Sequence, residues 1–323
     1  MVVFPSPAGV GVIAVTKINP EKVTREYQHK CQTIIRSVIP DVSKIFFQKL
    51  KLNYVVDIKE KIKIPEYVEF DRTAIRENIQ YKIDNNLALI AHVLVPLCDN
   101  ENQGIVPTTE SLGNGLSLRT NLYWATSNGM KRYFKEKSDW KFLQSIIYDK
   151  DSTILERVVF KKKYKNGVEV ILINDAYRGD RMENCLIDFF HSLSGELTDT
   201  VFVANDTLLI NSGADLVAFN GHNGLMDVAV DEFYNQDGKQ KDAVVIACSS
   251  MYEFNYRLNM MQAYPLVMTT NLLYPGAFVM EGVINNWALM KSDEEIRLSA
   301  GDAYHRVKKC GVNGARNLFS TGW

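Results

Sequence analysis

The chain has 323 residues, of which 46% are hydrophobic and 23% charged, and its 37 Lys and Arg residues nearly balance its 38 Asp and Glu residues. This is an ordinary globular composition, so it excludes a disordered, collagen-like or fibrous chain. A net charge of −1 gives the chain no global electrostatic reason to bind nucleic acid or an anionic membrane. We therefore expect one large domain or two smaller ones, with no nucleic-acid or membrane partner.

Residues 1–84 differ in composition from the rest of the chain. Apolar residues recur at helical spacing in 21–52, and residues 58–64 (IKEKIKI) alternate like an exposed strand. We predict that 1–84 is a partly helical N-terminal extension. Its apolar start lacks the basic region and cleavage site of a signal peptide. No run in the chain reaches the ~18 apolar residues of a membrane span. The sequence does not decide the cellular compartment of the protein, although it slightly favours the cytoplasm.

From residue 85 onward, apolar runs alternate with amphipathic stretches. In chain order, the pattern predicts a strand at 87–97, a helix within 119–143, a hairpin of strands 153–164 and 168–174 around Lys165-Asn166-Gly167, a helix at 181–193 closed by Gly195, a strand at 215–220, a helix at 228–234, strands at 243–247 and 265–270, and helices at 277–290 and 293–309 with Gly311 as a C-cap.

Strands that are apolar on both faces and alternate with helices are typical of a parallel sheet covered on both sides. We therefore predict a doubly wound α/β domain over 85–323. In such a sheet, ligands bind at the carboxyl ends of the strands. Four of these predicted ends are polar, namely Asp99-Asn100, residues 175–181, residues 222–224 and residues 248–250.

The most specific feature is a histidine and a cysteine at two of these ends. His222 follows the apolar run DLVAFN, and Cys248 follows AVVIA. The separation of 26 positions leaves room for one helix and a short loop, so the two strands can be neighbours. Their ends would then meet at one edge of the sheet. A cysteine beside an imidazole can be a thiolate nucleophile, and the imidazole can protonate a leaving amine.

The segments LVAFNGHNG and VVIACSS resemble the caspase-like superfamily of cysteine peptidases, which includes caspases, legumains, gingipains and clostripain. The resemblance implies a caspase-like sheet, in which the strand at 87–97 is central and neighbours the histidine-bearing strand. It implies His222 and Cys248 as a catalytic dyad, without metal or organic cofactor, acting on a peptide or protein. The C-terminal half also resembles a group of bacterial proteins of unassigned activity.

One residue departs from the superfamily pattern. Members usually carry Gly directly after the catalytic histidine, and its backbone N–H helps to bind the oxyanion; this chain has Asn223 there, followed by Gly224. Asn tolerates positive φ better than most residues, so the backbone donors of Asn223 and Cys248 can still form the oxyanion hole. The departure also favours an alternative, in which an inactive caspase-like module binds a protein partner or a small ligand at the same crevice.

Four further residues are candidates for substrate binding: Asp99, Asn100, Asp175 and Arg178. In the superfamily, residues after the central strand line the pocket for the P1 side chain, so Asp99 would select Arg or Lys there through a charge-assisted hydrogen bond. The alternative is that Asp99 caps its own loop in an Asx turn. Arg178 suits a carboxylate or phosphate, or else a salt-bridge cluster with Asp180.

Other chemistry has little support in the sequence. The cysteines are odd in number and widely spaced, which argues against a disulfide scaffold and a Cys-rich zinc site. We expect most of them to be reduced and packed. His222, Asp227 and Asp231 are three potential metal ligands within ten residues, but no H-E-x-x-H motif accompanies them, so we predict no metal. Without a Walker or G-x-G-x-x-G motif, we predict no nucleotide cofactor. The cysteines are Cys31, Cys98, Cys185, Cys248 and Cys310.

Overall fold

The computed structural model describes residues 18–19, 55–56 and 70–323. The chain divides into two compact units, Met1–Glu66 and Tyr67–Trp323. In the first unit, strands β1 (Ile18–Asn19) and β2 (Val55–Val56) pair antiparallel. The helical spacing predicted at 21–52 and the strand predicted at 58–64 lie outside the described residues.

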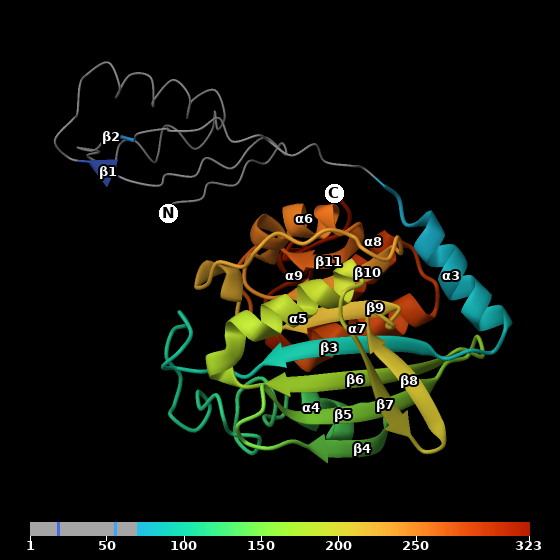
Figure 1. Cartoon of the computed structure of the whole chain (residues 1–323), viewed down its shortest axis with the longest axis horizontal. Helices are drawn as coiled ribbons and strands as arrows, with labels where there is room; N and C mark the ends of the chain where they lie inside the picture. The colour runs from blue at the N-terminus through green and yellow to red at the C-terminus, as the bar shows by residue number, and fades with distance from the viewer. Residues whose placement is uncertain (1–17, 20–54, 57–69) are drawn as a thin grey trace. The chain divides into compact units, whose positions relative to one another are not determined.

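Residues 70–323 form an eight-stranded sheet in the order β12-β11-β10-β9-β3-β6-β5-β4 (Figure 1). The five strands from β11 to β6 are parallel, whereas β4, β5 and β12 run antiparallel to their neighbours. The predicted α/β class is therefore confirmed, with a mostly parallel sheet. The strands are β3 (Leu89–Pro96), β4 (Lys141–Ile147), β5 (Ile154–Lys163), β6 (Glu169–Tyr177), β9 (Leu216–Asn220), β10 (Lys241–Ile246), β11 (Ala263–Thr269) and β12 (Phe319–Ser320).

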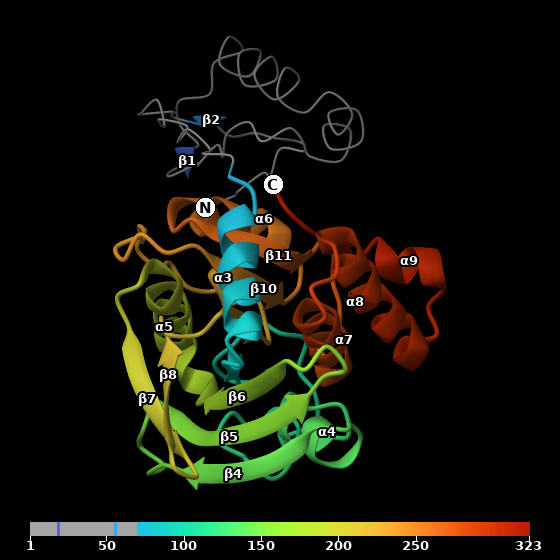
Figure 2. The ribbon, with the colours of Figure 1, turned by 90° about the vertical axis from the view of Figure 1, so that its right-hand side faces the viewer.

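Both faces of the sheet are covered, which is why its central strands are continuously apolar (Figure 2). One face packs against α3 (Thr73–Asp84), α4 (Met130–Glu136), α7 (Ala277–Ala288) and α8 (Asp293–Lys308). The other packs against α5 (Met182–Ser194), α6 (Ser250–Met260) and the hairpin of β7 (Thr198–Val203) and β8 (Asp206–Asn211). A short helix, α9 (Val312–Arg316), precedes β12. No helix in the described part of the chain has the length and apolarity needed to cross a membrane.

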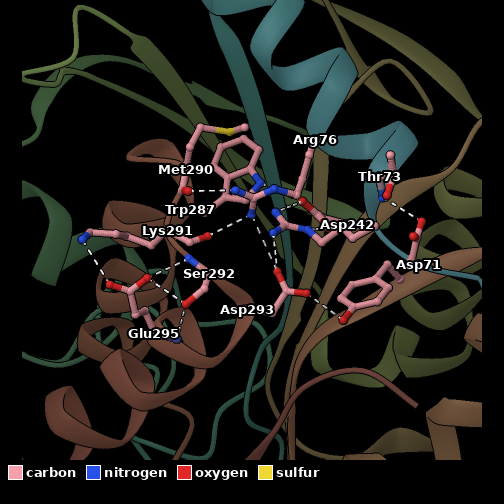
Figure 3. Close-up of polar contacts among 12 residues, drawn as sticks. Asp71, Thr73, Arg76, Asp242, Trp287, Met290, Lys291, Ser292, Asp293 and Glu295 are labelled. Carbon is pink, nitrogen blue, oxygen red and sulfur yellow. Dashed lines mark hydrogen bonds and ion pairs between the residues drawn. The ribbon is translucent and has the colours of Figure 1, made fainter.

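The domain begins earlier than the predicted boundary at 84/85. Helix α3 belongs to it, because Ile75 and Ile79 are buried in its core. Arg72, at the start of α3, forms a buried bidentate ion pair with Asp242 of β10, with two bonds of 2.6 Å, and also binds Asp293. Trp287 donates to Asp242 as well, so these contacts join α3 to β10, α7 and α8 (Figure 3). Burial opposes the charge of Arg72, but Asp242 and Asp293 raise its pKa.

Several predicted elements are confirmed within a few residues. The Asn-Gly hairpin joins β5 to β6, and Gly167 has φ +87°, a conformation that glycine adopts without strain. Helix α5 ends at Gly195, which has φ +94°. The strands predicted at 87–97, 215–220, 243–247 and 265–270 correspond to β3, β9, β10 and β11, and the last two predicted helices to α7 and α8.

Other predictions are wrong. The helix expected within 119–143 forms only at Met130–Glu136. Before it, the side chain of Asn121 forms hydrogen bonds with both backbone groups of Cys98 and with the backbone N–H of Tyr123, in place of a helical turn. Residues 141–147 form β4 instead. The helix expected at 228–234 is irregular, and Arg257 binds the carbonyl groups of residues 230 and 231. Gly311 does not cap α8, since Lys309 takes the left-handed position and Gly311 precedes α9.

Candidate active site at the carboxyl ends of β9 and β10

His222 and Cys248 follow neighbouring parallel strands at the same level of the sheet. Strands β9 and β10 pair in register, and the last pair is Asn220 with Ile246. Each of the two candidate residues stands two positions beyond that pair. The predicted adjacency of the two strands is therefore confirmed, and both residues lie at the edge where parallel strands end.

A side-chain hydrogen bond joins the two segments. Nδ2 of Asn223 donates to the carbonyl oxygen of Cys248 at 2.8 Å, and the backbone N–H of Gly221 donates to the carbonyl of Ile246 at 3.2 Å. Asn223 has φ −74°, so this position requires no left-handed conformation and accommodates Asn without strain. The departure from Gly thus adds a link between the histidine and cysteine segments.

The two predicted oxyanion donors are uncommitted. Within residues 70–323, the backbone N–H groups of Asn223 and Cys248 have no hydrogen-bond acceptor. The side-chain oxygens of Asn220 and Asn223 are likewise buried without a partner in this part of the chain. Buried polar groups are normally paired, so unpaired groups of both kinds at one strand edge are those that a bound ligand or water would satisfy.

The imidazole of His222 is paired with a carboxylate that the sequence did not assign to the dyad. Nε2 of His222 lies 2.8 Å from Oδ2 of Asp227, and the same oxygen accepts the backbone N–H of Gly104 at 2.8 Å. The side chain of His222 is 8% exposed and that of Asp227 is 22% exposed. The sequence analysis considered Asp227 only as one of three potential metal ligands, together with His222 and Asp231.

Cys248 differs from the other described cysteines. Cys98 and Cys185 are buried; burial raises the pKa of the Cys98 thiol to about 11 and that of Cys185 well above its ordinary value. These two are therefore unreactive packed thiols at neutral pH. Cys248 is half-buried, and its Sγ donates to the carbonyl oxygen of Leu273 at 3.5 Å. Cys310 is exposed. No hydrogen bond joins Cys248 directly to His222 within residues 70–323.

Burial raises the pKa of Tyr123 and of Tyr304, and the charge of an ionised Cys248 adds to the shift in both cases. Tyr123 is held by Asn121, which accepts its backbone N–H at 3.1 Å and also binds both backbone groups of Cys98.

Asp99 and Asn100 line a cavity of about 530 Å³ at the end of β3. The carboxylate of Asp99 accepts the backbone N–H groups of Glu101 and Asn102 and the side-chain amide of Asn102, at 2.9 to 3.2 Å. Asp99 therefore makes the Asx-type turn that was the alternative expectation. Asn100 holds the loop by pairing with both backbone groups of Thr108. Loop 97–129 projects from the edge to which the β3 arrow points in Figure 1.

The other two substrate-binding predictions do not fit the structure. Asp175 is fully buried within the sheet, where Arg157 binds both of its oxygens and His92 binds one, so it is not accessible to a substrate. Its position in β6 points it into the layer under α5. Arg178 makes a bidentate pair with Asp180 at 2.8 and 2.9 Å and donates to the carbonyl of Lys150. Its guanidinium is thus already engaged.

Among the described residues, no group of three or more His, Cys, Asp and Glu side chains is arranged to hold a metal ion. No family model, curated protein or solved structure matches the chain.

Proposed function

We propose that this chain is a hydrolase of the cysteine peptidase type with a caspase-like fold, in which Cys248 is the nucleophile and His222 the general acid and base. The observation that carries the proposal is the placement of these two residues. Each follows the last paired residue of its strand by two positions, and the Asn223 side chain joins their segments at 2.8 Å. Side chains on one edge of the sheet can act on one carbonyl group.

The strand order supports the caspase-like assignment. The resemblance requires a central strand beside the histidine-bearing strand, and β3 pairs with β9 while β10 lies beyond it. The loop after β3 lines a cavity, which we assign to the P1 side chain of the substrate. The antiparallel strands β5 and β4 extend the sheet on the far side of β6 without altering this edge.

The proposed reaction has two halves. The thiolate of Cys248 attacks the scissile carbonyl carbon, forming a C–S bond, and His222 gives a proton to the leaving amine as the C–N bond breaks. Water then attacks the acyl-enzyme, His222 accepts a proton from it, and the C–S bond breaks to release a carboxylic acid, which leaves the Cys248 thiolate and the protonated His222 with which the cycle began. The uncommitted N–H groups of Asn223 and Cys248 would bind the oxyanion in both halves.

The cavity favours a substrate with a basic P1 side chain. Four carboxylates line it: Asp99, Glu101, Glu110 and Asp180. Those of Asp99 and Asp180 are engaged within the protein, whereas those of Glu101 and Glu110 have no hydrogen bond or ion pair in residues 70–323. A Lys or Arg side chain would therefore pair with these two glutamates more readily than with Asp99.

The test is cleavage of a peptide library by the full chain. We expect wild type to cleave after Arg or Lys, Cys248→Ala to lose at least about a thousandfold in rate, and the exposed control Cys310→Ser to retain wild-type activity. Retained activity in Cys248→Ala would refute the assignment. An inactive wild type that nevertheless binds peptides at this edge would support the alternative, a binding module without catalysis.

A further inference from the structure

The hydrogen bonds around Asp227 fix how the ring of His222 is protonated. Oδ2 of Asp227 accepts the backbone N–H of Gly104 and lies 2.8 Å from Nε2 of His222. An ionised carboxylate only accepts hydrogen bonds, so Nε2 must be the nitrogen that carries the proton. In the neutral ring, Nδ1 is then the basic nitrogen. Nδ1 has no hydrogen-bond partner among the described residues.

We propose that Asp227 is a positioning residue that holds His222 in the Nε2–H tautomer, so that Nδ1 is the nitrogen that exchanges protons with the thiol, the leaving amine and the hydrolytic water. The inference rests on the proposed function, because it assigns a role within the same dyad. A carboxylate that fixes the tautomer and orientation of a catalytic imidazole also stabilises the imidazolium that forms during catalysis.

Gly104 fixes the carboxylate in turn. A Cβ atom on residue 104 would lie 2.4 Å from Oδ1 of Asp227 and 3.2 Å from its Cγ, so only glycine allows this approach. Gly104 also donates its N–H to the same carboxylate. It lies two residues after the loop segment 99–102, which lines the cavity. The loop that lines the cavity thus also holds the carboxylate that orients the histidine.

The tautomer can be measured without any substrate. We propose two-bond ¹H–¹⁵N correlation spectra of the full chain labelled at histidine nitrogen, recorded at about pH 9, where a histidine of ordinary pKa is neutral. The His222 signals are identified by their loss in His222→Gln. We expect the Nε2–H pattern in wild type and a mixed or Nδ1–H pattern in Asp227→Asn and Gly104→Ala. An unchanged Nε2–H pattern in Asp227→Asn would overturn the proposal.

Kinetics provide the second measurement. Asp227→Asn should lower kcat about 10- to 100-fold while KM stays within about twofold, because the substrate contacts are intact. Asp231→Asn removes the same charge four residues further along the irregular connection and should match wild type. Equal losses in both variants would show a general charge effect and refute the positioning role.

These measurements also separate the two proposals. If wild type cleaves nothing but the tautomer changes in Asp227→Asn, the tautomer assignment of His222 stands and the peptidase proposal fails. If wild type is active and Asp227→Asn changes neither kcat nor the tautomer, the peptidase proposal stands and the role of Asp227 is refuted.

Discussion

The domain contains two histidine–aspartate pairs with opposite surroundings. At the strand edge, His222 meets Asp227 through Nε2 alone, and the two side chains are 8% and 22% exposed. In the sheet interior, Nε2 of His92 lies 2.9 Å from Oδ2 of Asp175, and both side chains are fully buried. The interior pair has two further partners: Nδ1 of His92 accepts the backbone N–H of Asn211, and Arg157 binds Asp175.

The difference shows that the pairing itself does not define a site. In the interior pair, both ring nitrogens and both carboxylate oxygens are engaged, so the imidazole has no free position at which to exchange a proton with a ligand. At the edge, one ring nitrogen has no partner among the described residues, and a half-buried thiol follows the neighbouring strand. We therefore expect the interior pair to hold the hairpin β7–β8 to the sheet and the edge pair to act on a substrate.

The largest effects should come from removing each histidine in turn. His222→Ala should lower peptidase activity at least about a hundredfold and change the free energy of unfolding by about 1 kcal/mol or less. His92→Ala should keep the peptidase activity and lower the free energy of unfolding by about 2–4 kcal/mol, because the buried N–H of Asn211 loses its acceptor and Oδ2 of Asp175 keeps only Arg157.

Initial cleavage rates and urea unfolding midpoints, measured on the same preparations, check both effects. Cleavage is measured at a temperature at which His92→Ala remains folded. A large loss of stability in His222→Ala with full activity would invert the two roles and contradict the comparison.

The interior pair should also shape the acid sensitivity of the domain. Burial alone would raise the pKa of Asp175, but His92 and Arg157 hold it below its ordinary value. A carboxyl group with a lowered native pKa contributes stability that is fully present above the unfolded value, about 4, and is lost as the pH falls through the native value. Asp175→Asn should therefore unfold more easily at pH 7 yet lose less further stability between about pH 5 and pH 2.

Urea midpoints across that pH range measure the difference. If the wild-type and Asp175→Asn profiles run parallel, the carboxylate of Asp175 does not supply this acid sensitivity.

A smaller effect, on the preference for the P1 side chain, should come from the carboxylates of the cavity. Some of them are paired within the protein, like the interior Asp175, and others are unpaired among the described residues. Asp99 resembles Asp175 in being satisfied by the protein, whereas Glu101 and Glu110 are unpaired within the described residues. Replacing both glutamates by Gln should reduce the preference for Arg over Gln at P1 by about tenfold, since one charge-assisted pair is lost. Asp99→Asn should reduce it by less. Matched peptides that differ only at P1 provide the measurement, and a larger effect of Asp99→Asn would restore Asp99 as the selecting residue.

The sequence was sufficient for the parts of the fold that depend on local pattern. Apolar runs such as Leu216–Asn220 and Lys241–Ile246 predicted the buried strands, and Asn166-Gly167 predicted the hairpin. The adjacency of the strands that precede His222 and Cys248 followed from the same runs. The sequence pattern predicted helices wrongly where a side chain binds the backbone in place of helical hydrogen bonds. Asn121 binds backbone groups of Cys98 and Tyr123 in this way, and Arg257 binds the carbonyl groups of residues 230 and 231.

The site residues that the sequence did not predict correctly also depend on contacts between segments distant in the chain. Asp175 looked like a polar strand end, but its partners Arg157 and His92 lie on neighbouring strands, and only the tertiary pairing buries it. Asp227 was missed as a partner of His222 because its contact depends on an irregular turn and on Gly104, which precedes it by 123 residues. The domain boundary was misplaced for a similar reason, since the partner of Arg72 is Asp242.

The central claim is that His222 activates the thiol of Cys248. Its most direct test is to treat the full chain with iodoacetamide at neutral pH and to measure the alkylation rate of each cysteine by mass spectrometry. The account predicts that Cys248 reacts faster than the exposed Cys310, that Cys98 and Cys185 react slowest, and that only the rate at Cys248 falls in His222→Ala. If Cys248 reacts more slowly than Cys310 and its rate is the same in wild type and His222→Ala, the two residues do not form a reactive pair.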